Sequence, residues 1–184
     1  MNIIKTEIEG LLIVEPRVFG DSRGYFFESF NERDFKTQTG VDVRFVQDNE
    51  SRSRYGVVRG LHFQMPPYAQ TKLVRVVEGT VLDIAVDIRA GSPTYGRHVE
   101  VELSADNKRQ FFIPKGFAHG FAVLSETAIF QYKCDEYYHP EAEGAIAWDD
   151  PALAIEWRIK QDDVLLSEKD RCHPLFKDFV TPFK

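Results

Sequence analysis

Residues 82–88 alternate strictly between large aliphatic side chains and other side chains, and this periodicity constrains the fold more than any other feature of the chain. Leucine, isoleucine and valine occupy the even positions, and Asp83, Ala85 and Asp87 lie between them. Residues 99–103 (VEVEL) repeat the pattern with glutamates. Side chains two positions apart share one face of a strand, whereas a helix needs a spacing of three or four. The alternation therefore predicts half-buried β-strands in the middle of the chain.

Turn-forming sequences interrupt the strand-like segments. Glycine, proline, asparagine and aspartate mark the predicted turns at residues 78–79, 90–93, 105–107 and 114–116. Strands that alternate with such turns every 8–12 residues or so, as a rough rule, are typical of antiparallel sandwiches and barrels. We therefore predict about six to eight short strands in a mainly β protein.

Helical signals are few and short. Asn31 and Gly40 are suitable capping residues for a helix of about two turns between them. A further helical turn is predicted after Asp150, because Pro151 suits the first helical position. Another is predicted to start at Ser167. These elements are expected at the edges of the β structure.

The chain has 184 residues, which corresponds to about one domain of ordinary size. It contains no internal repeat, low-complexity tract or flexible linker. We expect a single domain over residues 1–184, with an N-terminal strand extension and a C-terminal arm of helical turns. The arm carries Phe176, Phe179 and Phe183. Aromatic side chains in a terminal arm indicate that it packs on another surface, and a second subunit is one candidate.

The charge balance excludes several classes of partner. The chain has 23 lysines and arginines against 29 aspartates and glutamates, a formal net charge of −6, so it lacks the basic field that nucleic acids and anionic membranes require. Its longest aliphatic run, residues 11–14 (LLIV), is far shorter than the ~20 residues of a membrane helix, and no signal-peptide pattern is present. Two cysteines are too few for a disulfide framework. We therefore expect a cytoplasmic protein that binds neither nucleic acid nor membranes.

Two segments resemble the paired motifs of the cupin family. Residues 60–64 (GLHFQ), followed by Lys72, correspond to the first motif, and residues 114–121 (PKGFAHGF) match the second, Pro-x-Gly-x-x-His. The resemblance implies a cupin-like jelly-roll β-sandwich or barrel with a few short peripheral helices. Metal-binding cupins have a second histidine where this chain has Gln64, and a carboxylate at or near Lys72. Because an amide is a poor ligand and an ammonium group repels a cation, we predict no metal.

Each of these residues also has a simpler interpretation. A single histidine such as His62 or His119 in a strand is more often a hydrogen-bonded core residue, and a single Lys72 a solvated one. Two motifs in the correct order within a β-patterned chain favour the functional interpretation. A cavity that contains two histidines and a lysine suits an anionic ligand or a developing negative charge.

Segments spread over almost the whole chain resemble the dTDP-4-dehydrorhamnose 3,5-epimerase family. They are residues 19–28 (FGDSRGYFFE), 45–49 (FVQDN), 58–64 (VRGLHFQ), 72–75 (KLVR), 111–114 (FFIP), 116–121 (GFAHGF), 137–138 (YY) and 166–170 (LSEKD). The resemblance implies inversion of dTDP-4-dehydro-6-deoxy-D-glucose at C3 and C5, which gives dTDP-4-dehydro-L-rhamnose for dTDP-L-rhamnose biosynthesis. Both carbons flank the C4 ketone, so a base, an electrophile and an acid suffice. No cofactor is implied, and the chain has no glycine-rich dinucleotide fingerprint.

Four residues carry the catalytic roles that the resemblance implies. His62 is the general base, and Asp170 would fix its tautomer through the other ring nitrogen. Lys72 would stabilise the enolate at the C4 oxygen. Tyr132 matches the proton donor on the opposite face, since a phenol keeps its proton at neutral pH. Two structural alternatives remain: Ser167-x-x-Asp170 is also a helix-start pattern, and a tyrosine in such a strand is often a core residue.

The resemblance also implies a nucleotide-binding site. Arg23 and Arg59 would hold the diphosphate, since guanidinium groups bind phosphate oxygens in a bidentate manner. Phe26 and Tyr138 would stack on the thymine ring. The other expected substrate-binding residues are Glu28, Gln47, Asp48, Asn49, Lys72, His119, Glu143 and Lys169.

The family resemblance implies a homodimer in which an N-terminal strand is exchanged between subunits. The apolar run at residues 11–14 needs cover, and residues 23–28 would in that case serve the neighbouring site.

Three alternative functions remain at this point. Relatives within the same fold invert only C3 or only C5, or move the ketone. A metal-dependent cupin would need stoichiometric metal, against the argument from Gln64 and Lys72. A non-catalytic sugar-binding module would bind the nucleotide sugar without turnover.

Overall fold

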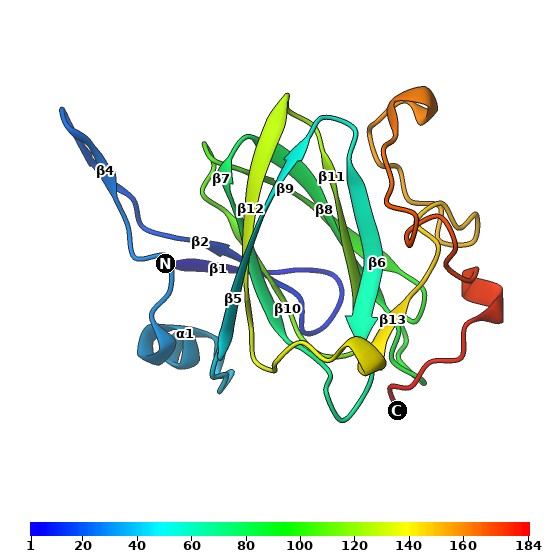
Figure 1. The fold of residues 1–184 in the computed structure, drawn as a ribbon. Coiled ribbons are helices and arrows are strands. Elements are labelled where there is room, and N and C mark those ends of the chain that lie inside the picture. Colours follow the sequence, from blue (N-terminus) through cyan, green and yellow to red (C-terminus); the bar gives the residue numbers. More distant parts are fainter.

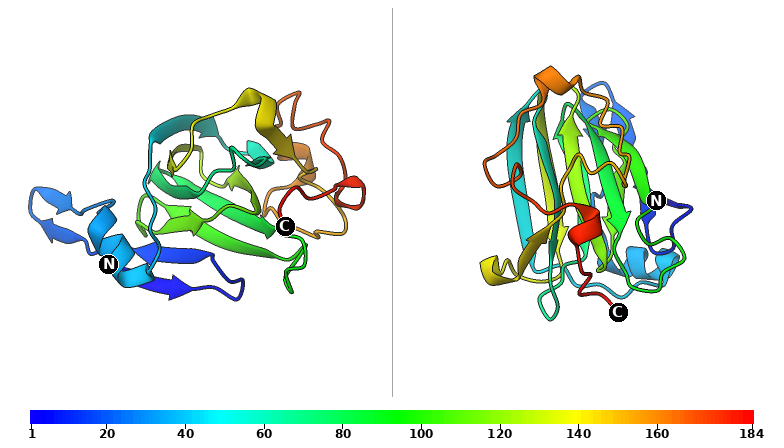
Figure 2. Two further views of the ribbon diagram at one scale, coloured as in Figure 1. Left: turned by 90° about the horizontal axis from the view of Figure 1, so that it is seen from below. Right: turned by 90° about the vertical axis from the view of Figure 1, so that its right-hand side faces the viewer.

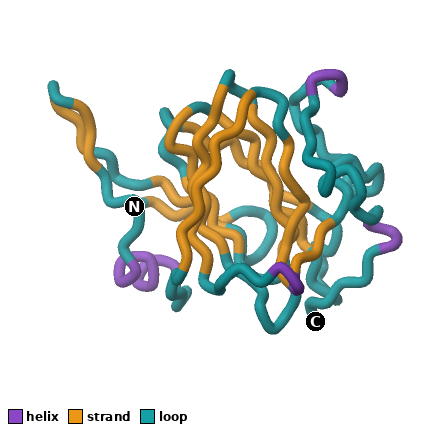
Figure 3. Tube along the Cα trace, in the orientation of Figure 1, coloured by secondary structure: helices purple, strands orange, loops and turns teal.

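The computed structural model describes all residues from 1 to 184, and most of its regular structure is β-strand (Figure 3). One sheet has six strands, in the order β1 (Asn2–Lys5), β2 (Leu12–Glu15), β10 (Gln110–Ile113), β7 (Lys72–Glu78), β12 (Thr127–Cys134) and β5 (Gln47–Arg54). The other has five, in the order β13 (Glu143–Ala145), β6 (Val58–Gln64), β11 (Phe117–Val123), β8 (Thr80–Asp87) and β9 (His98–Ser104). The two antiparallel sheets face each other as a sandwich (Figure 1), which confirms the predicted jelly-roll type of fold.

The prediction of six to eight strands was too low, and strand β5 shows why. Its sequence, QDNESRSR, contains no apolar residue, so hydrophobic alternation cannot reveal it. The strand is held by backbone pairing with β12 over its whole length, from Gln47 opposite Cys134 to Arg54 opposite Thr127. Strands at the edge of a sheet need little apolar surface when pairing on one side fixes them.

Strands β8 and β9 confirm the predicted strands of the central region, but β8 is not half-buried. Asp83 and Asp87, two of the residues that alternate with aliphatic ones, have no exposed surface. The inner face of β8 packs toward the six-stranded sheet. Its outer face is covered by the C-terminal segment, which contributes Leu153, Trp157 and Phe183 to a second apolar cluster (Figure 2). Both faces of β8 are therefore buried.

The aromatic C-terminal arm packs on its own chain. The rings of Phe179 and Phe183 lie with their centroids 5.5 and 6.0 Å from that of Phe63 on β6. Residues 11–14 are likewise covered within the chain, because β2 lies between β1 and β10. Neither apolar segment needs a second subunit for its burial.

One of the three predicted helical segments is a helix. Helix α1 (Glu32–Thr39) begins after Asn31, whose side chain accepts a hydrogen bond from the Asp34 backbone, and ends at Gly40 in the left-handed conformation. The single turn predicted after Asp150 is present, with Asp150 accepting hydrogen bonds from the backbone that follows it. The segment that begins at Ser167 is also a turn, and no helix starts there. Single 3₁₀ turns occur at η1 (Pro140–Ala142), η2 (Gln161–Asp163) and η3 (Phe176–Asp178). No helix has the length and apolar character needed to cross a bilayer.

A hairpin of β3 (Phe19–Asp21) and β4 (Gly24–Phe26) projects away from the sandwich (Figure 1). Its aromatic side chains Phe19, Tyr25 and Phe26 are exposed, Phe26 to 66%. Large apolar side chains gathered on an isolated hairpin are unusual on a free surface.

Candidate active site

The strand register places histidines and a tyrosine on facing walls of the sandwich. His62 on β6 is the direct partner of His119 on β11, so both side chains lie on the same face of the five-stranded sheet. The neighbours of His62 in sequence, Leu61 and Phe63, belong to the outer cluster beneath the C-terminal segment, and His62 therefore faces the interior. Tyr132 on β12 packs against the inner core from the six-stranded sheet.

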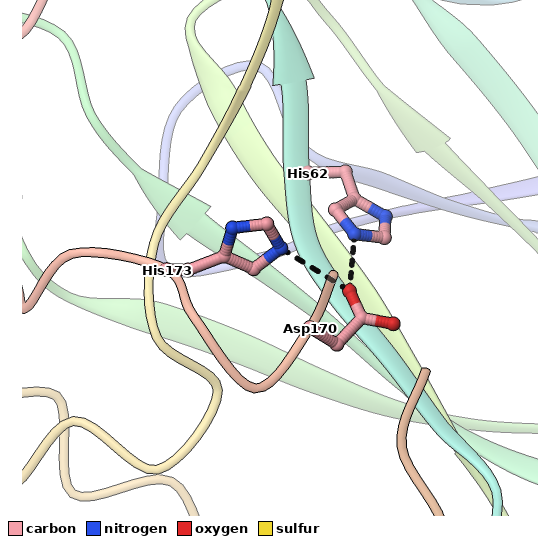
Figure 4. A group of neighbouring side chains, drawn as sticks. All are labelled: His62, Asp170 and His173. Atoms are coloured by element: carbon pink, nitrogen blue, oxygen red, sulfur yellow. Dashed lines mark hydrogen bonds and ion pairs between the residues drawn. The ribbon is translucent and has the colours of Figure 1, made fainter. Parts of the chain in front are cut away.

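His62 contacts Asp170, which comes from the C-terminal segment (Figure 4). The Nε2 atom of His62 lies 2.6 Å from Oδ1 of Asp170, and the Asp170 carboxylate is 5% exposed. Burial raises the pKa of Asp170, but hydrogen bonds from His62, Ser167 and His173 outweigh it and hold that pKa at about 2. An ionised carboxylate only accepts hydrogen bonds. Nε2 of His62 therefore carries the hydrogen, and Nδ1 keeps the lone pair that a base needs.

His173 is a third member of this cluster, and it was not among the site residues predicted from the sequence. Its Nε2 atom lies 3.3 Å from the same Oδ1 of Asp170, and its ring meets that of His62 edge-on, with centroids 5.7 Å apart. The spacing Asp170-x-x-His173 was visible in the sequence. Its meaning depends on the turn at residues 168–171, which had been interpreted as a helix start.

Lys72 and Tyr132 lie together on the six-stranded sheet. The Lys72 Nζ atom is 5.8 Å from the centroid of the Tyr132 ring. Burial lowers the pKa of Lys72, and the charges of Cys134, Asp83 and Glu143 oppose this shift. Burial raises the pKa of Tyr132. At neutral pH the phenol therefore keeps its proton and remains available as an acid.

His119 is paired with Asp83, one of the polar residues that alternate with aliphatic ones in the strand predicted to be half-buried. Nε2 of His119 lies 2.9 and 3.0 Å from the two carboxylate oxygens of Asp83. Burial raises the pKa of Asp83, while the charges of His119 and Lys72 lower it. The pair places a polar group on the inner wall beside Lys72. The sequence held one signal for this pair: Asp83 lies among aliphatic residues, and Lys72 was already expected in the interior.

The donor set at the cupin motif positions does not fit a divalent metal. Both functional atoms of Gln64 are engaged: the amide nitrogen donates to the carbonyls of Tyr68 and Tyr137, and the amide oxygen accepts from the His139 backbone. Nε2 of His119 is bound to Asp83, and Lys72 adds an ammonium group.

Five of the expected nucleotide-binding residues form a continuous series of contacts. Gln47 donates to Asn49 and accepts from the Tyr138 backbone, both at 3.0 Å. The Tyr138 hydroxyl lies 3.4 Å from Glu143, which also pairs with Lys169. The series leads from β5 at the edge of one sheet to Lys169, the neighbour of Asp170.

A cavity of about 390 Å³ opens beside His62. Its polar lining consists of Arg59, His62, Glu143, Ser167, Lys169 and Asp170. Arg59 donates to the Ser53 hydroxyl and has no carboxylate partner, so its charge faces the cavity uncompensated. Tyr132 lines a second cavity of about 300 Å³. Burial raises the pKa of Tyr132, and the charge of Arg59, which lines the first cavity, partly opposes this shift.

The structure does not bring four expected binding residues to His62 within one chain. Arg23 lies on the projecting hairpin and pairs with Asp21 at 2.6 Å. Phe26 is exposed on the same hairpin, and Glu28 follows it, where it accepts from Asn31. Asp48 points away from its strand neighbours Gln47 and Asn49 and pairs with Lys133 on the surface.

The chain is similar to known proteins over nearly its whole length. The family model described as dTDP-4-dehydrorhamnose 3,5-epimerase matches residues 5–178. The chain is 58% identical over 170 residues to the dTDP-4-dehydrorhamnose 3,5-epimerase of Escherichia coli (strain K12). The alignment covers 92% of this chain and 91% of that protein.

Solved structures agree. The dTDP-6-deoxy-D-glucose-3,5-epimerase of Legionella pneumophila Philadelphia 1, in complex with dTDP-4-keto-L-rhamnose, superposes with a TM-score of 0.95 at 53% identity, covering 100% of this chain and 98% of that one. A 3′-monoepimerase from Streptomyces bikiniensis, in complex with dTDP-quinovose, gives 0.85 at 34% identity, covering 92% and 85%. The match of the family model over nearly the whole length and the identity to the curated relatives show that this chain belongs to the dTDP-4-dehydrorhamnose 3,5-epimerase family.

Proposed function

We propose that this protein inverts C3 and C5 of dTDP-4-dehydro-6-deoxy-D-glucose to give dTDP-4-dehydro-L-rhamnose, as a step of dTDP-L-rhamnose biosynthesis. The observation that carries the proposal is the placement of His62, which contacts Asp170, on one sheet and of Tyr132 and Lys72 on the other. Inversion of a carbon needs a base and an acid on opposite sides of the substrate, and the two facing sheets supply them.

The proton transfers proceed from these four residues alone. Nδ1 of His62 takes the proton from C3 or C5. The electron pair of that C–H bond forms a double bond to C4, and the π pair of the C4 carbonyl moves to its oxygen, which gives an enolate. The ammonium of Lys72 stabilises the enolate, a role for which one preorganised donor contributes about 3–4 kcal/mol of barrier lowering. The Tyr132 hydroxyl then protonates the carbon from the opposite face. Asp170 stays ionised and stabilises the imidazolium. Exchange with solvent then removes the extra proton from His62 and returns a proton to Tyr132.

The nucleotide occupies the series of polar contacts that ends at Lys169. Arg59 faces the cavity without a carboxylate partner and suits a diphosphate oxygen. Tyr138 offers an exposed ring for the base, and Gln47 and Asn49 offer amide groups beside it. His119, held by Asp83, would contact the sugar.

The protein acts as a homodimer in this proposal. The β3–β4 hairpin exposes Phe19, Tyr25 and Phe26 away from its own sandwich, and Arg23 and Glu28 lie on or next to it. Docking of the hairpin on a second copy would bury the aromatic side chains and bring Arg23 to the partner's cavity. Each chain contributes one domain, and the two unpaired cysteines are compatible with action in the cytoplasm.

Deuterium incorporation distinguishes the double epimerase from a single one. Incubation of the 4-keto sugar with the protein in D₂O should label both C3 and C5, because each inversion returns a solvent-derived proton. Label at C3 alone would indicate a single inversion, as in the Streptomyces bikiniensis 3′-monoepimerase, and label at C5 alone would also contradict the double inversion. A downstream 4-ketoreductase that accepts only the doubly inverted sugar provides an independent readout.

A further inference from the structure

Three side chains with metal-ligand atoms meet where the base is held. Nε2 of His62 and Nε2 of His173 approach the same oxygen, Oδ1 of Asp170, at 2.6 and 3.3 Å (Figure 4). The ligand atoms of the three residues all lie within 4.8 Å of one another. We infer that this cluster binds a divalent ion of the zinc class and that the bound ion inhibits the enzyme. The inhibition, but not the binding, rests on the proposed role of His62 as the base.

The donor atoms suit zinc in type and in spacing. Two imidazole nitrogens and one carboxylate oxygen are ligands that zinc prefers, and three protein ligands leave a fourth position for water. Tetrahedral zinc with bonds of about 2.0–2.1 Å needs donor atoms about 3.3 Å apart. The contact between His173 and Asp170 is already 3.3 Å, and that between His62 and Asp170 would lengthen by less than 1 Å or so as the ion replaces a hydrogen. The cavity beside His62 leaves room for the fourth ligand.

The backbone holds the three ligands in place without a metal. His62 lies in β6, which is paired on both sides by β11 and β13. The turn that carries Asp170 is closed by Ser167, whose hydroxyl donates to Oδ2 of Asp170 at 2.7 Å. Ser167 therefore occupies the second carboxylate oxygen and leaves Oδ1 for the ion. The neighbouring Lys169 pairs with Glu143, which reduces its repulsion of a cation.

Metal binding would exchange the tautomers of the two histidines. Without metal, Nε2 of each ring carries the hydrogen that it donates to Asp170, and Nδ1 of His62 has the free lone pair. With metal on Nε2, the hydrogen of each neutral ring resides on Nδ1, and no net proton is released. The lone pair that would attack the C–H bond is then lost, in addition to any blockage of the cavity by the ion. Zinc bound here is therefore incompatible with proton abstraction.

Two measurements on the full-length protein test the inference. Calorimetric titration with zinc sulfate, without substrate, should give one site per chain, and His173→Gln should weaken zinc binding at least tenfold, because glutamine approximates the size of histidine but is a poor zinc ligand. Turnover at free zinc concentrations fixed by a chelating buffer should fall for the wild type. The inhibition constant should rise in His173→Gln by the same factor as the dissociation constant, each variant being referred to its own zinc-free rate.

Matched substitutions control for two other side chains that could bind zinc. His98→Gln, on β9, and Cys172→Ser, next to His173, should keep both zinc binding and inhibition. The inference is overturned if the wild type shows no stoichiometric zinc site, or if His173→Gln binds zinc as tightly as the wild type does. Zinc that binds with the expected dependence on His173 but leaves turnover unchanged would overturn the inhibition and also count against His62 as the base. Loss of turnover in His62→Ala, measured without zinc, tests the base separately.

Discussion

The Nε2 atom of His62 lies 2.6 Å from Oδ1 of Asp170, and this contact selects the tautomer of the imidazole. The carboxylate, with its pKa held at about 2, is ionised at every pH at which the enzyme would work. It accepts a hydrogen bond from Nε2 and so leaves the lone pair on Nδ1. It also stabilises the positive charge that His62 acquires when it takes a proton.

Replacement of either partner should therefore abolish most of the turnover without loss of nucleotide binding. We expect His62→Ala to lower kcat about 10²–10⁴-fold, the usual contribution of a general base. Asp170→Asn should give a loss in the same range, because an amide can donate to Nε2 and no longer selects the tautomer. Turnover assays and calorimetry with dTDP would measure the two effects. His98→Ala is the matched control on a distant strand, and a His62→Ala enzyme with ordinary kcat would refute the assignment.

Lys72 should control the alkaline limit of activity. Burial lowers the pKa of this lysine, so its ammonium is lost below the pH range in which an exposed lysine titrates, and enolate stabilisation is lost with it. Lys72→Met should reduce kcat about 10²–10³-fold, as removal of one preorganised donor does. Lys72→Arg, which stays charged, should retain partial activity and move the alkaline fall of kcat to higher pH. An alkaline limb that is identical in the wild type and Lys72→Arg would contradict this role.

The sequence predicts best where local pattern and burial agree. The alternation at residues 82–88 and 99–103 predicts β8 and β9, and the capping residues Asn31 and Gly40 predict α1 to within one residue at each end. The proximity of His62 and Asp170, 108 positions apart, came only through the family resemblance. No local pattern encodes a contact over that separation.

The failures have physical causes in the same chain. The alternation at residues 82–88 shows which side chains are polar but not which are exposed to solvent. Asp83 is buried and bound to His119, yet it gives the same sequence pattern as an exposed aspartate. The all-polar β5 has no hydrophobic signal at all. His173 depends on the path of a turn, and the direction of the β3–β4 hairpin depends on surfaces outside its own sequence.

Asp87 should make stability sensitive to acid without a role in turnover. Burial raises its pKa, but hydrogen bonds from Arg89, Ser92 and Thr94 outweigh this and lower that pKa from 3.8 to about 2. Because the pKa of Asp87 is lower in the folded than in the unfolded chain, its ionised carboxylate stabilises the folded state at pH values above the unfolded-state pKa. This stabilisation is lost as the pH falls through about 2. We expect Asp87→Asn to reduce the free energy of unfolding by about 2 kcal/mol at pH 6.

Urea unfolding of the wild type and Asp87→Asn between pH 6 and pH 2 would measure this difference. The gap between the two proteins should narrow as the pH decreases below 4, while the turnover of folded Asp87→Asn at pH 7 should equal that of the wild type. A gap that is constant with pH would show that the ionised carboxylate is not the source of the stabilisation.

The hairpin can be tested by mixing two inactive variants. If Arg23 serves the partner's cavity, a dimer of one Arg23→Ala chain and one His62→Ala chain has one intact site and one site with both defects. Re-equilibrated equal mixtures should then recover about a quarter of the wild-type turnover, because half of the C₂ dimers are mixed and each has one working site. Recovery is not expected when Lys72→Met replaces Arg23→Ala, because Lys72 and His62 belong to the same chain's cavity. Mixtures without recovery, at a light-scattering mass of two chains, would place Arg23 outside the partner's site.

Tyr132→Phe should separate the two halves of an inversion. His62 and Lys72 remain, so the variant can still remove a proton from C3 or C5 and form the enolate, but no acid stands on the opposite face. The imidazolium then returns a proton to the face from which it came. In D₂O we expect solvent exchange at C3 or C5 with retained configuration, while formation of the inverted sugar falls about 10²–10⁴-fold. Mass spectrometry would follow the exchange and NMR the configuration. Loss of exchange together with inversion would mean that the phenol also assists proton removal, and unimpaired inversion would show that the acid is another group.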